Sequence, residues 1–256
     1  MMRGLHTPVR AIRRRVFKEV AQLGFKADED TLLADMEAIP YAIVNEDSEK
    51  YRESVYRARA IVRERLRLAM GLSLRPENKP VHLTAGVEAS NISEKYYEPP
   101  LMQVIPSACE SCEENKYEVS NICKGCLAHP CQEVCPKDAI SMVNGRSYID
   151  QEKCIKCGKC KSVCPYDAIA KKERPCQKAC GVNAIKSDKM GRAYIDNEKC
   201  VSCGMCMVSC PFGAISDKSQ IFQLARALSE GENVIAEIAP AFVGQFGDNI
   251  TPRNIK

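Results

Sequence analysis

All sixteen cysteines of this 256-residue chain fall between Cys109 and Cys210. Three groups of four stand at short, regular spacing, and each group is followed directly by proline. Thiolates spaced in this way are ligands for the iron of [4Fe–4S] clusters, each of which takes four of them. The three groups are Cys123, Cys126, Cys131 and Cys135; Cys154, Cys157, Cys160 and Cys164; and Cys200, Cys203, Cys206 and Cys210. Sixteen thiolates meet the requirement of four clusters, which indicates an electron conductor.

The cysteine-rich part contains an internal duplication. Residues 144–169 align without gaps to residues 190–215, and 15 of the 26 positions are identical. In the bacterial ferredoxin pattern, three cysteines of a run bind one cluster and the fourth reaches another. Each copy of the duplication therefore predicts a ferredoxin-like unit with two clusters.

The second unit lacks two ligands in its own sequence. At an offset of 45 residues, the counterparts of Cys123 and Cys126 are Ala168 and Lys171, which cannot bind iron. The only cysteines not yet used are Cys109 and Cys112, which have the missing C-x2-C spacing. We therefore expect this pair to return in space and complete the second unit. The first unit, 123–169, would then be inserted into a unit made of 109–112 and 171–215.

The crossed pattern assigns all sixteen cysteines to four [4Fe–4S] clusters. The predicted ligand sets are Cys123, Cys126, Cys131 and Cys164; Cys135, Cys154, Cys157 and Cys160; Cys180, Cys200, Cys203 and Cys206; and Cys109, Cys112, Cys176 and Cys210. For Cys109 and Cys112 a separate zinc or redox pair stays open as an alternative.

Other residues of the repeats have predicted structural roles. Gly125, Gly158 and Gly204 stand between cysteines, where backbone amides must approach the cluster sulfur. Proline follows three of the four terminal cysteines of the repeats, but Gly181 follows Cys180, which leaves the turn there uncertain. Residues 146–150 and 192–196 are predicted to form hairpin strands.

A disulfide framework is the alternative use of so many cysteines, and it requires an oxidising compartment. The chain shows no apolar signal segment and no run of about 20 apolar residues, so we expect a cytoplasmic, oxygen-sensitive protein without a membrane span. Its formal charge is +4. Four oxidised clusters at about −2 each bring it to about −4 (4 − 8), which weakens a nucleic-acid interpretation.

Residues 1–72 are predicted to be a helical region. Thr7 is a candidate cap for a helix that starts at Pro8 and stops at Gly24, and further helices are expected at 30–39 and 47–70. One face of the last helix is rich in arginine, through Arg52, Arg59, Arg63 and Arg67. The interpretations are a solvated face, a dock for an acidic ferredoxin, or a site for a nucleic acid or another anionic partner.

The remaining segments flank the four-cluster region, predicted at 108–216. Residues 73–107 are proline-containing and lack periodicity, which predicts a linker. Residues 217–256 are predicted to begin a following catalytic domain, with a helix at 219–229 and a buried strand at 234–239. The fold class is thus α+β, a helical N-terminal region followed by two intertwined bacterial-type 2[4Fe–4S] ferredoxin-like units.

The tail carries a resemblance to a known family. Four cluster motifs followed by a helix and by Ile238-Ala239-Pro240-Ala241-Phe242 and Gly244-Gln245-Phe246-Gly247 resemble the iron-only ([FeFe]) hydrogenases. In that family a similar segment opens the catalytic domain just after the ferredoxin-like region. The family's hydrogen-activating centre needs further cysteines downstream, and no cysteine follows Cys210. The resemblance therefore implies the electron-entry portion of a hydrogenase, an oxidoreductase whose catalytic centre this chain lacks.

Three functions follow as hypotheses. The first is that electron-entry portion, with a ferredoxin-like redox donor or acceptor and a downstream catalytic domain as its partners. The second is a free-standing polyferredoxin or an electron-transfer subunit of a larger oxidoreductase. The third is a zinc-ribbon protein that binds nucleic acid, although zinc ribbons prefer paired C-x2-C knuckles. His129 lies among the cysteines, but the ligand sets are complete without it.

Overall fold

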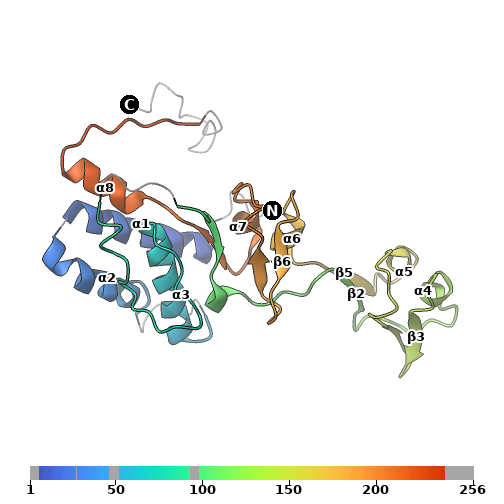
Figure 1. Ribbon diagram of the computed structural model, residues 1–256. Helices are drawn as coiled ribbons and strands as arrows, with labels where there is room; N and C mark the ends of the chain where they lie inside the picture. The colour runs from blue at the N-terminus through green and yellow to red at the C-terminus, as the bar shows by residue number, and fades with distance from the viewer. Residues whose placement is uncertain (1–5, 27, 46–51, 93–97, 240–256) are drawn as a thin grey trace.

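The chain combines helices and short strands in an α+β arrangement (Figure 1). The computed structural model describes residues 6–26, 28–45, 52–92 and 98–239. A helical unit comprises four helices, namely α1 (Pro8–Lys26), α2 (Glu29–Ile43), α3 (Val55–Ala69) and α8 (Ile221–Ser229). Between α3 and α8 lie the cysteine-rich region and four antiparallel pairs of short strands.

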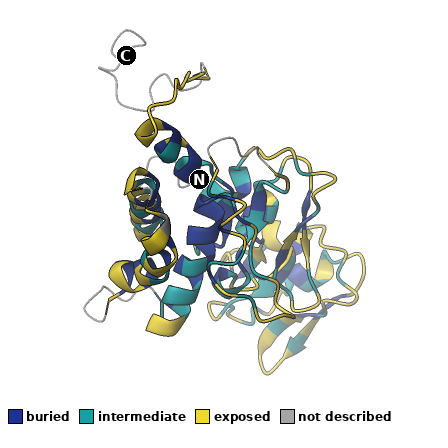
Figure 2. Cartoon of the chain, turned by 60° about the vertical axis from the view of Figure 1, so that its left-hand side comes forward, coloured by how far each residue is buried: buried dark blue, intermediate teal, exposed yellow. Residues whose placement is uncertain are grey.

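The core of the helical unit is built from the apolar stripe of each helix. Its members include Val16, Val20, Leu23, Met36, Ile39, Val62, Leu66 and Phe222, all at most 6% exposed. Figure 2 shows the helices buried along their facing sides and exposed on their outer sides. The helical periodicity of the first 72 residues therefore gives a packed core that contains no cysteine.

Helix α1 starts as predicted but extends two residues past Gly24. The Thr7 hydroxyl oxygen accepts a hydrogen bond from the Arg10 amide at 3.3 Å, which caps the first turn. Gly24 does not end the helix. A Cβ atom at this position would lie 2.6 Å from the Phe222 carbonyl oxygen and 2.8 Å from the Ala225 Cβ atom. The glycine is thus required by the close approach of α8.

Replacing Gly24 with alanine is expected to destabilise the protein by about 1–3 kcal/mol, because the added methyl group must push α8 away from α1. The free energy of unfolding measured in urea checks this value. Gly181→Ala is the matched control, since a methyl group there would meet no atom within 4 Å. Equal stability of the two variants would contradict the proposed contact.

The other two N-terminal helices differ from the prediction at their ends. Helix α2 runs on to Ile43 through Pro40, and the backbone amide of Val44 donates to the Pro40 carbonyl oxygen at its end. Helix α3 begins at Val55, and residues 46–51 of the predicted helix lie outside the described residues.

The prediction of a solvated arginine face on α3 is wrong. Arg67 is 6% exposed and donates hydrogen bonds to the carbonyl oxygens of Ser73, Leu83 and Ala85. The other three arginines are also at least partly buried. Arg59 donates to the Val44 carbonyl oxygen, Arg63 to the Tyr41 hydroxyl, and Arg52 to the Ala108 and Phe212 carbonyl oxygens. These side chains therefore serve the fold, because they hold loops against the helix.

The segment 73–107 is more than a linker. Leu83 and Val87 enter the helical core, and the described part ends in β1 (Met102–Val104) and the 3-10 helix η1 (Pro106–Ala108). Strand β1 pairs antiparallel with β8 (Ile215–Asp217), so that Val104 lies opposite Ile215. The segment thus joins the helical unit to the last cysteine motif.

The C-terminal part also departs from the prediction. Helix α8 lies within the predicted 219–229, but it packs into the helical unit through Phe222. Residues 234–239 are exposed and form no strand, so the predicted buried strand is wrong. Residues 240–256, which include most of the hydrogenase-like segment, lie outside the described residues. In the part of the chain that the structure covers, no helix is long and apolar enough to cross a membrane.

The cysteine-rich region consists of two parts. The inner lobe, residues 116–172, is closed by the pairing of β2 (Lys116–Val119) with β5 (Ile169–Lys172) and contains the hairpin β3 (Ile140–Val143) with β4 (Arg146–Ile149). The outer part, 109–115 with 173–217, contains the hairpin β6 (Ile185–Ser187) with β7 (Ala193–Ile195). Both predicted hairpin strands are confirmed. Figure 1 shows the inner lobe at the end of the molecule opposite the helical unit.

Candidate iron–sulfur centres

Four turns of the same geometry follow the last cysteine of each repeat motif. In each turn, the amide of the alanine four residues after the cysteine donates to the cysteine sulfur, and that alanine is at most 3% exposed. The N–S distances are 3.4 Å for Ala139 and Cys135, 3.4 Å for Ala168 and Cys164, 3.2 Å for Ala184 and Cys180, and 3.3 Å for Ala214 and Cys210. An amide that points at sulfur stabilises negative charge on it.

The residue before each of these alanines has a positive φ angle, which turns the amide toward the sulfur. The angles are 47° at Asp138, 48° at Asp167, 53° at Asn183 and 60° at Gly213. The turn after Cys180 therefore has the same form as the others, although Gly181 replaces the proline. The uncertainty about this turn is thus resolved, because the Asn183 amide donates to the Cys180 carbonyl oxygen at 3.3 Å.

Four C-x2-C loops, Cys109–Cys112, Cys123–Cys126, Cys154–Cys157 and Cys200–Cys203, share a positive φ angle at the same position. The residue before the second cysteine has φ of 46° at Ser111, 57° at Gly125, 59° at Lys156 and 54° at Ser202. The loop of Cys109 and Cys112 therefore has the same bend as the three loops of the full repeat motifs. This likeness favours a cluster role for the pair over a separate zinc or redox pair.

The structure brings the thiols together in four groups. Three groups each line a small cavity of their own. Site A contains Cys123, Cys126, Cys131 and Cys164; site B contains Cys135, Cys154, Cys157 and Cys160; and site D contains Cys109, Cys112, Cys176 and Cys210. These are the thiols that the sequence assigned to common clusters, and their role as ligands stays a prediction.

The fourth group, site C, contains Cys180, Cys200, Cys203 and Cys206. Cys206 packs in one apolar cluster with Cys180 and Cys200. The pKa of Cys206 is raised to about 11, chiefly by burial and in smaller part by the charges of Cys200, Cys180 and Cys203. All sixteen cysteines are free thiols, so the structure contains no disulfide framework.

Burial is the main influence on the innermost thiols. It raises the pKa of Cys176 to about 12, and the nearby charge of Cys210 acts in the same direction. The pKa values of Cys112 and Cys160 are also raised, again chiefly by burial. Four thiolates in one apolar pocket repel each other, so they require a positively charged group between them. The iron of a [4Fe–4S] cluster supplies that charge, and binding it releases the thiol protons.

Two glycines of the cysteine loops are required by close packing against other parts of the protein, and the loops provide amide donors to the cysteine sulfurs. A Cβ atom on Gly125 would collide with the Gly145 carbonyl oxygen, and one on Gly158 would lie 2.6 Å from the Tyr117 hydroxyl oxygen. Further amide donors are Lys156 to the Cys154 sulfur at 3.4 Å and Ala193 to the Cys109 sulfur at 3.3 Å. The residues present therefore fit four-thiolate clusters. Within the described ranges, no three His, Cys, Asp or Glu side chains are grouped to hold a single metal ion.

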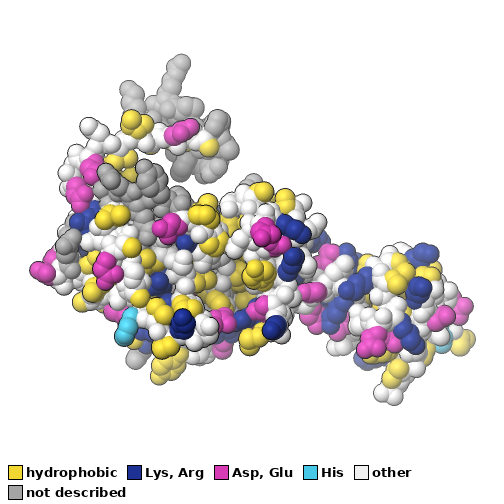
Figure 3. Space-filling model, viewed as in Figure 1, with side chains coloured by type: hydrophobic (Ala, Val, Ile, Leu, Met, Phe, Trp, Pro, Cys, Tyr) yellow, Lys and Arg dark blue, Asp and Glu magenta, His cyan; other side chains and the backbone are white. Residues whose placement is uncertain are grey.

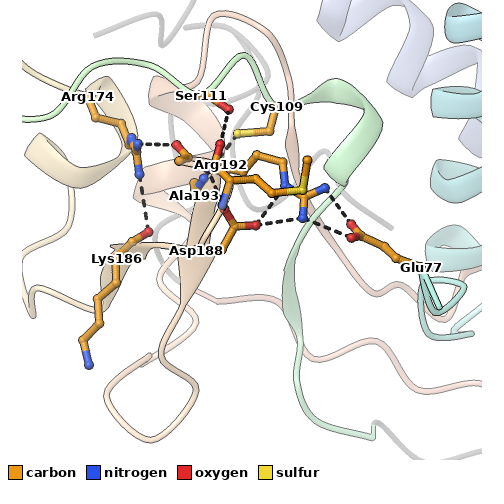
Figure 4. Close-up of polar contacts among 10 residues, drawn as sticks. Glu77, Cys109, Ser111, Arg174, Lys186, Asp188, Arg192 and Ala193 are labelled. Atoms are coloured by element: carbon orange, nitrogen blue, oxygen red, sulfur yellow. Dashed lines mark hydrogen bonds and ion pairs between the residues drawn. The ribbon is translucent and has the colours of Figure 1, made fainter.

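Arg174 fixes the Cys109–Cys112 loop, a role that the sequence analysis missed (Figure 4). Its side chain is 3% exposed and donates to the Cys112 carbonyl oxygen at 2.8 and 3.0 Å. It also donates to the Gly191 carbonyl oxygen and the Ser187 hydroxyl, both at 2.8 Å. Arg174 therefore ties this loop to the β6–β7 hairpin. The only sequence signal is its position two residues before Cys176.

Replacing Arg174 with methionine is expected to cost the protein the cluster at site D, about four iron atoms per chain. The substitution leaves the Cys112 and Gly191 carbonyl oxygens without these donors, which costs about 2 kcal/mol or more. Iron content and the free energy of unfolding are the measurements. Arg192→Met is the control, because Arg192 forms ion pairs near the surface with Glu77 and Asp188. Full iron content in Arg174→Met would contradict the role.

Comparisons with known proteins place the same segments among iron–sulfur proteins. A family model described as the LdpA Fe–S cluster-binding domain matches residues 123–174, and one described as a 4Fe–4S binding domain matches residues 193–216. The chain is similar to ferredoxin 7Fe of Hydrogenibacillus schlegelii, with 43% identity over 53 residues that cover 21% of this chain and 68% of that protein.

Two longer relatives are matched over smaller shares of their length. An uncharacterized ferredoxin of Methanocaldococcus jannaschii is 33% identical over 99 residues, which cover 31% of this chain and 63% of the relative. The electron transport protein HydN of Escherichia coli is 37% identical over 71 residues, which cover 27% of this chain and 41% of the relative. The chain thus spans less than two thirds of these two relatives.

Proposed function

Since the chain belongs to the ferredoxin family and transfers electrons through iron–sulfur clusters, we propose that it carries four [4Fe–4S] clusters, one at each of sites A to D. The observation that supports this number is the grouping of sixteen free thiols into four sets of four. The inner lobe would be one two-cluster unit, inserted into a second unit that the Cys109–Cys112 loop completes.

The protein's own residues would tune each centre in the same way. The clusters supply the one-electron chemistry when they are bound. The four buried alanine amides donate to sulfur and so favour the reduced, more negative state. An isoleucine follows each of these alanines, at Ile140, Ile169, Ile185 and Ile215, and each is at most 4% exposed, which excludes water from one side of the site. No substrate needs to bind within the described part of the chain for this relay.

The test is the number of electrons that the purified protein takes up and returns. Anaerobic photoreduction of the cluster-loaded protein is expected to add about four electrons per chain, one for each cluster. Addition of a small oxidant is expected to return the original visible spectrum. Uptake of about two electrons would contradict four working clusters, and irreversible bleaching would reject a relay.

We place this relay as the electron-entry portion of an iron-only hydrogenase. The support is the tail segment that resembles that family. The matched relatives are ferredoxins and electron transport proteins, which support the relay but do not bear on the hydrogenase. A free-standing polyferredoxin or an electron-transfer subunit is the alternative. Sequencing the natural coding region decides between them: further cysteine motifs after Lys256 support the hydrogenase, and a stop codon there rejects it.

Sixteen free thiols also fit a reducing compartment such as the cytoplasm.

A further inference from the structure

Four lysines surround site B, and we call them the lysine collar: Lys137, Lys156, Lys159 and Lys161. All four are exposed, and Lys137 and Lys159 line the cavity of site B. Cys157, one of the thiols of this site, is exposed as well. Figure 3 shows several Lys and Arg side chains on the inner lobe, at the right of the view, among acidic and hydrophobic ones. Exposed lysines therefore stand on the loops that carry the cysteines of a redox centre close to the surface.

The collar is not part of the lobe's own ion pairs. Lys156, Lys159 and Lys161 of the collar lie within residues 154–165, a stretch without an acidic residue. Among the described residues, no carboxylate lies within 4.0 Å of a collar ammonium group. Some lysines elsewhere in the cysteine-rich region form ion pairs instead. Lys171, Lys178 and Lys186 each pair with a carboxylate at 2.9 Å or less.

The internal repeat shows that the fold does not require the collar. The duplicated loop at site C has the same cysteine spacing and a similar short helix, α7 (Met205–Ser209) in place of α5 (Lys159–Ser162). At the positions of Lys156, Lys159 and Lys161, that loop has Ser202, Met205 and Met207. The same loop is therefore built without these charges, so the lysines at site B serve something other than the turn.

We propose that the collar docks a small acidic electron-transfer protein of the ferredoxin type, which exchanges electrons with site B. One electron passes between the partner's cluster and the cluster of site B, so that one is oxidised as the other is reduced, and no proton or further reactant is needed. A cluster with four thiolates carries about −2 and would repel an acidic partner, and the four ammonium groups reverse the sign of that local field. This inference rests on the proposed electron relay.

The centre of the collar suits a protein rather than a nucleic acid. Ile155, between two of the ligating cysteines of site B, is 56% exposed and lines the same cavity. An apolar contact at the centre with charges around it is the usual anatomy of a transient protein interface. The expected dock of an acidic ferredoxin thus lies on the inner lobe, while the arginines of α3 are held by the fold.

The test replaces three collar lysines with the residues that stand at the same positions of the second repeat. In the cluster-loaded protein, the triple variant Lys156→Ser, Lys159→Met and Lys161→Met is compared with wild type for electron transfer from a reduced acidic two-cluster ferredoxin. At low ionic strength the rate constant is expected to fall at least about tenfold. At about 1 M salt the two proteins are expected to converge, because charges are then screened beyond about 3 Å. Calorimetric titration with the oxidised ferredoxin is expected to show matching weaker binding.

Two controls separate the possible failures. Replacing the exposed Lys18, Lys79 and Lys189 with methionine removes the same total charge away from the lobe and is expected to leave the rate nearly unchanged. Reduction by an uncharged photoreductant reports on the relay itself and is expected to be equal in all variants. If the photoreductant fails, the proposed function fails. An equal loss in both triple variants, or a loss only of oligonucleotide binding in the collar variant, would overturn the docking proposal.

Discussion

Replacing Cys210 with alanine is expected to remove one cluster, about four of sixteen iron atoms, and to leave the cluster of Cys200, Cys203 and Cys206 intact. In the sequence, Cys210 continues the run of these three cysteines. In the structure it lines the cavity of site D with Cys109, Cys112 and Cys176, and it packs with Ile61 and Leu68 of α3. The loss should therefore fall on a different cluster from that of its sequence neighbours.

The measurement is iron content together with the electron paramagnetic resonance spectrum of the reduced protein. Cys180→Ala is the matched variant, because Cys180 groups with Cys206 at site C. Each variant is expected to lose about four iron atoms, but from different clusters, so that the two spectra lack different signals. If both variants lose the same signal, the crossed arrangement of the outer part is wrong.

Removal of the clusters is expected to unfold the cysteine-rich region while the helical unit stays folded. The apolar core of the inner lobe has six buried members, and Cys131 and Cys160 are two of them. Two-stranded sheets whose strands are only three or four residues long are not stable alone. The core of the helical unit has seventeen buried members and no cysteine. Binding energy of the clusters is thus folding energy for residues 116–172.

Hydrogen exchange before and after chelation of the iron tests this division. Amides of residues 116–172 are expected to lose essentially all protection, with a local opening free energy near ~0 kcal/mol. Amides of α1, α3 and α8 are expected to keep most of theirs. The cluster-loaded protein carried through the same steps without chelator is the control. Loss of protection in α1 to the same degree would show one cooperative unit and contradict the division.

The cysteine groups could be predicted because each depends on short spacing and on a duplicated pattern. A C-x2-C loop can fold around a cluster in only a few ways, so the spacing alone predicts that Cys154 and Cys157 share a cluster. The prediction for Cys109 and Cys112 required counting, since their partners are more than 60 residues away. The shared positive φ at Ser111 is visible only in the structure.

Contacts between segments that are distant in the sequence could not be predicted from the sequence pattern. Gly24 looks like a helix stop until the approach of α8, nearly 200 residues later, is known. Arginines at helical spacing on α3 look solvated, but Arg67 satisfies three carbonyl oxygens of the segment that follows it. The position of Arg174 two residues before Cys176 does not reveal its role, because its partners Cys112 and Gly191 lie far away on either side in the sequence. In each case the role of the residue depends on a contact with a segment distant in the sequence, which local periodicity does not reveal.

The central claim is that one chain holds four [4Fe–4S] clusters, and the direct measurement is iron, acid-labile sulfide and zinc per chain. The protein should be purified anaerobically and reconstituted before analysis. We expect about sixteen iron and about sixteen sulfide, four of each for every cluster, and no stoichiometric zinc. About twelve of each would contradict a cluster at site D and return Cys109 and Cys112 to a separate role. Zinc in place of iron would contradict the electron relay as a whole.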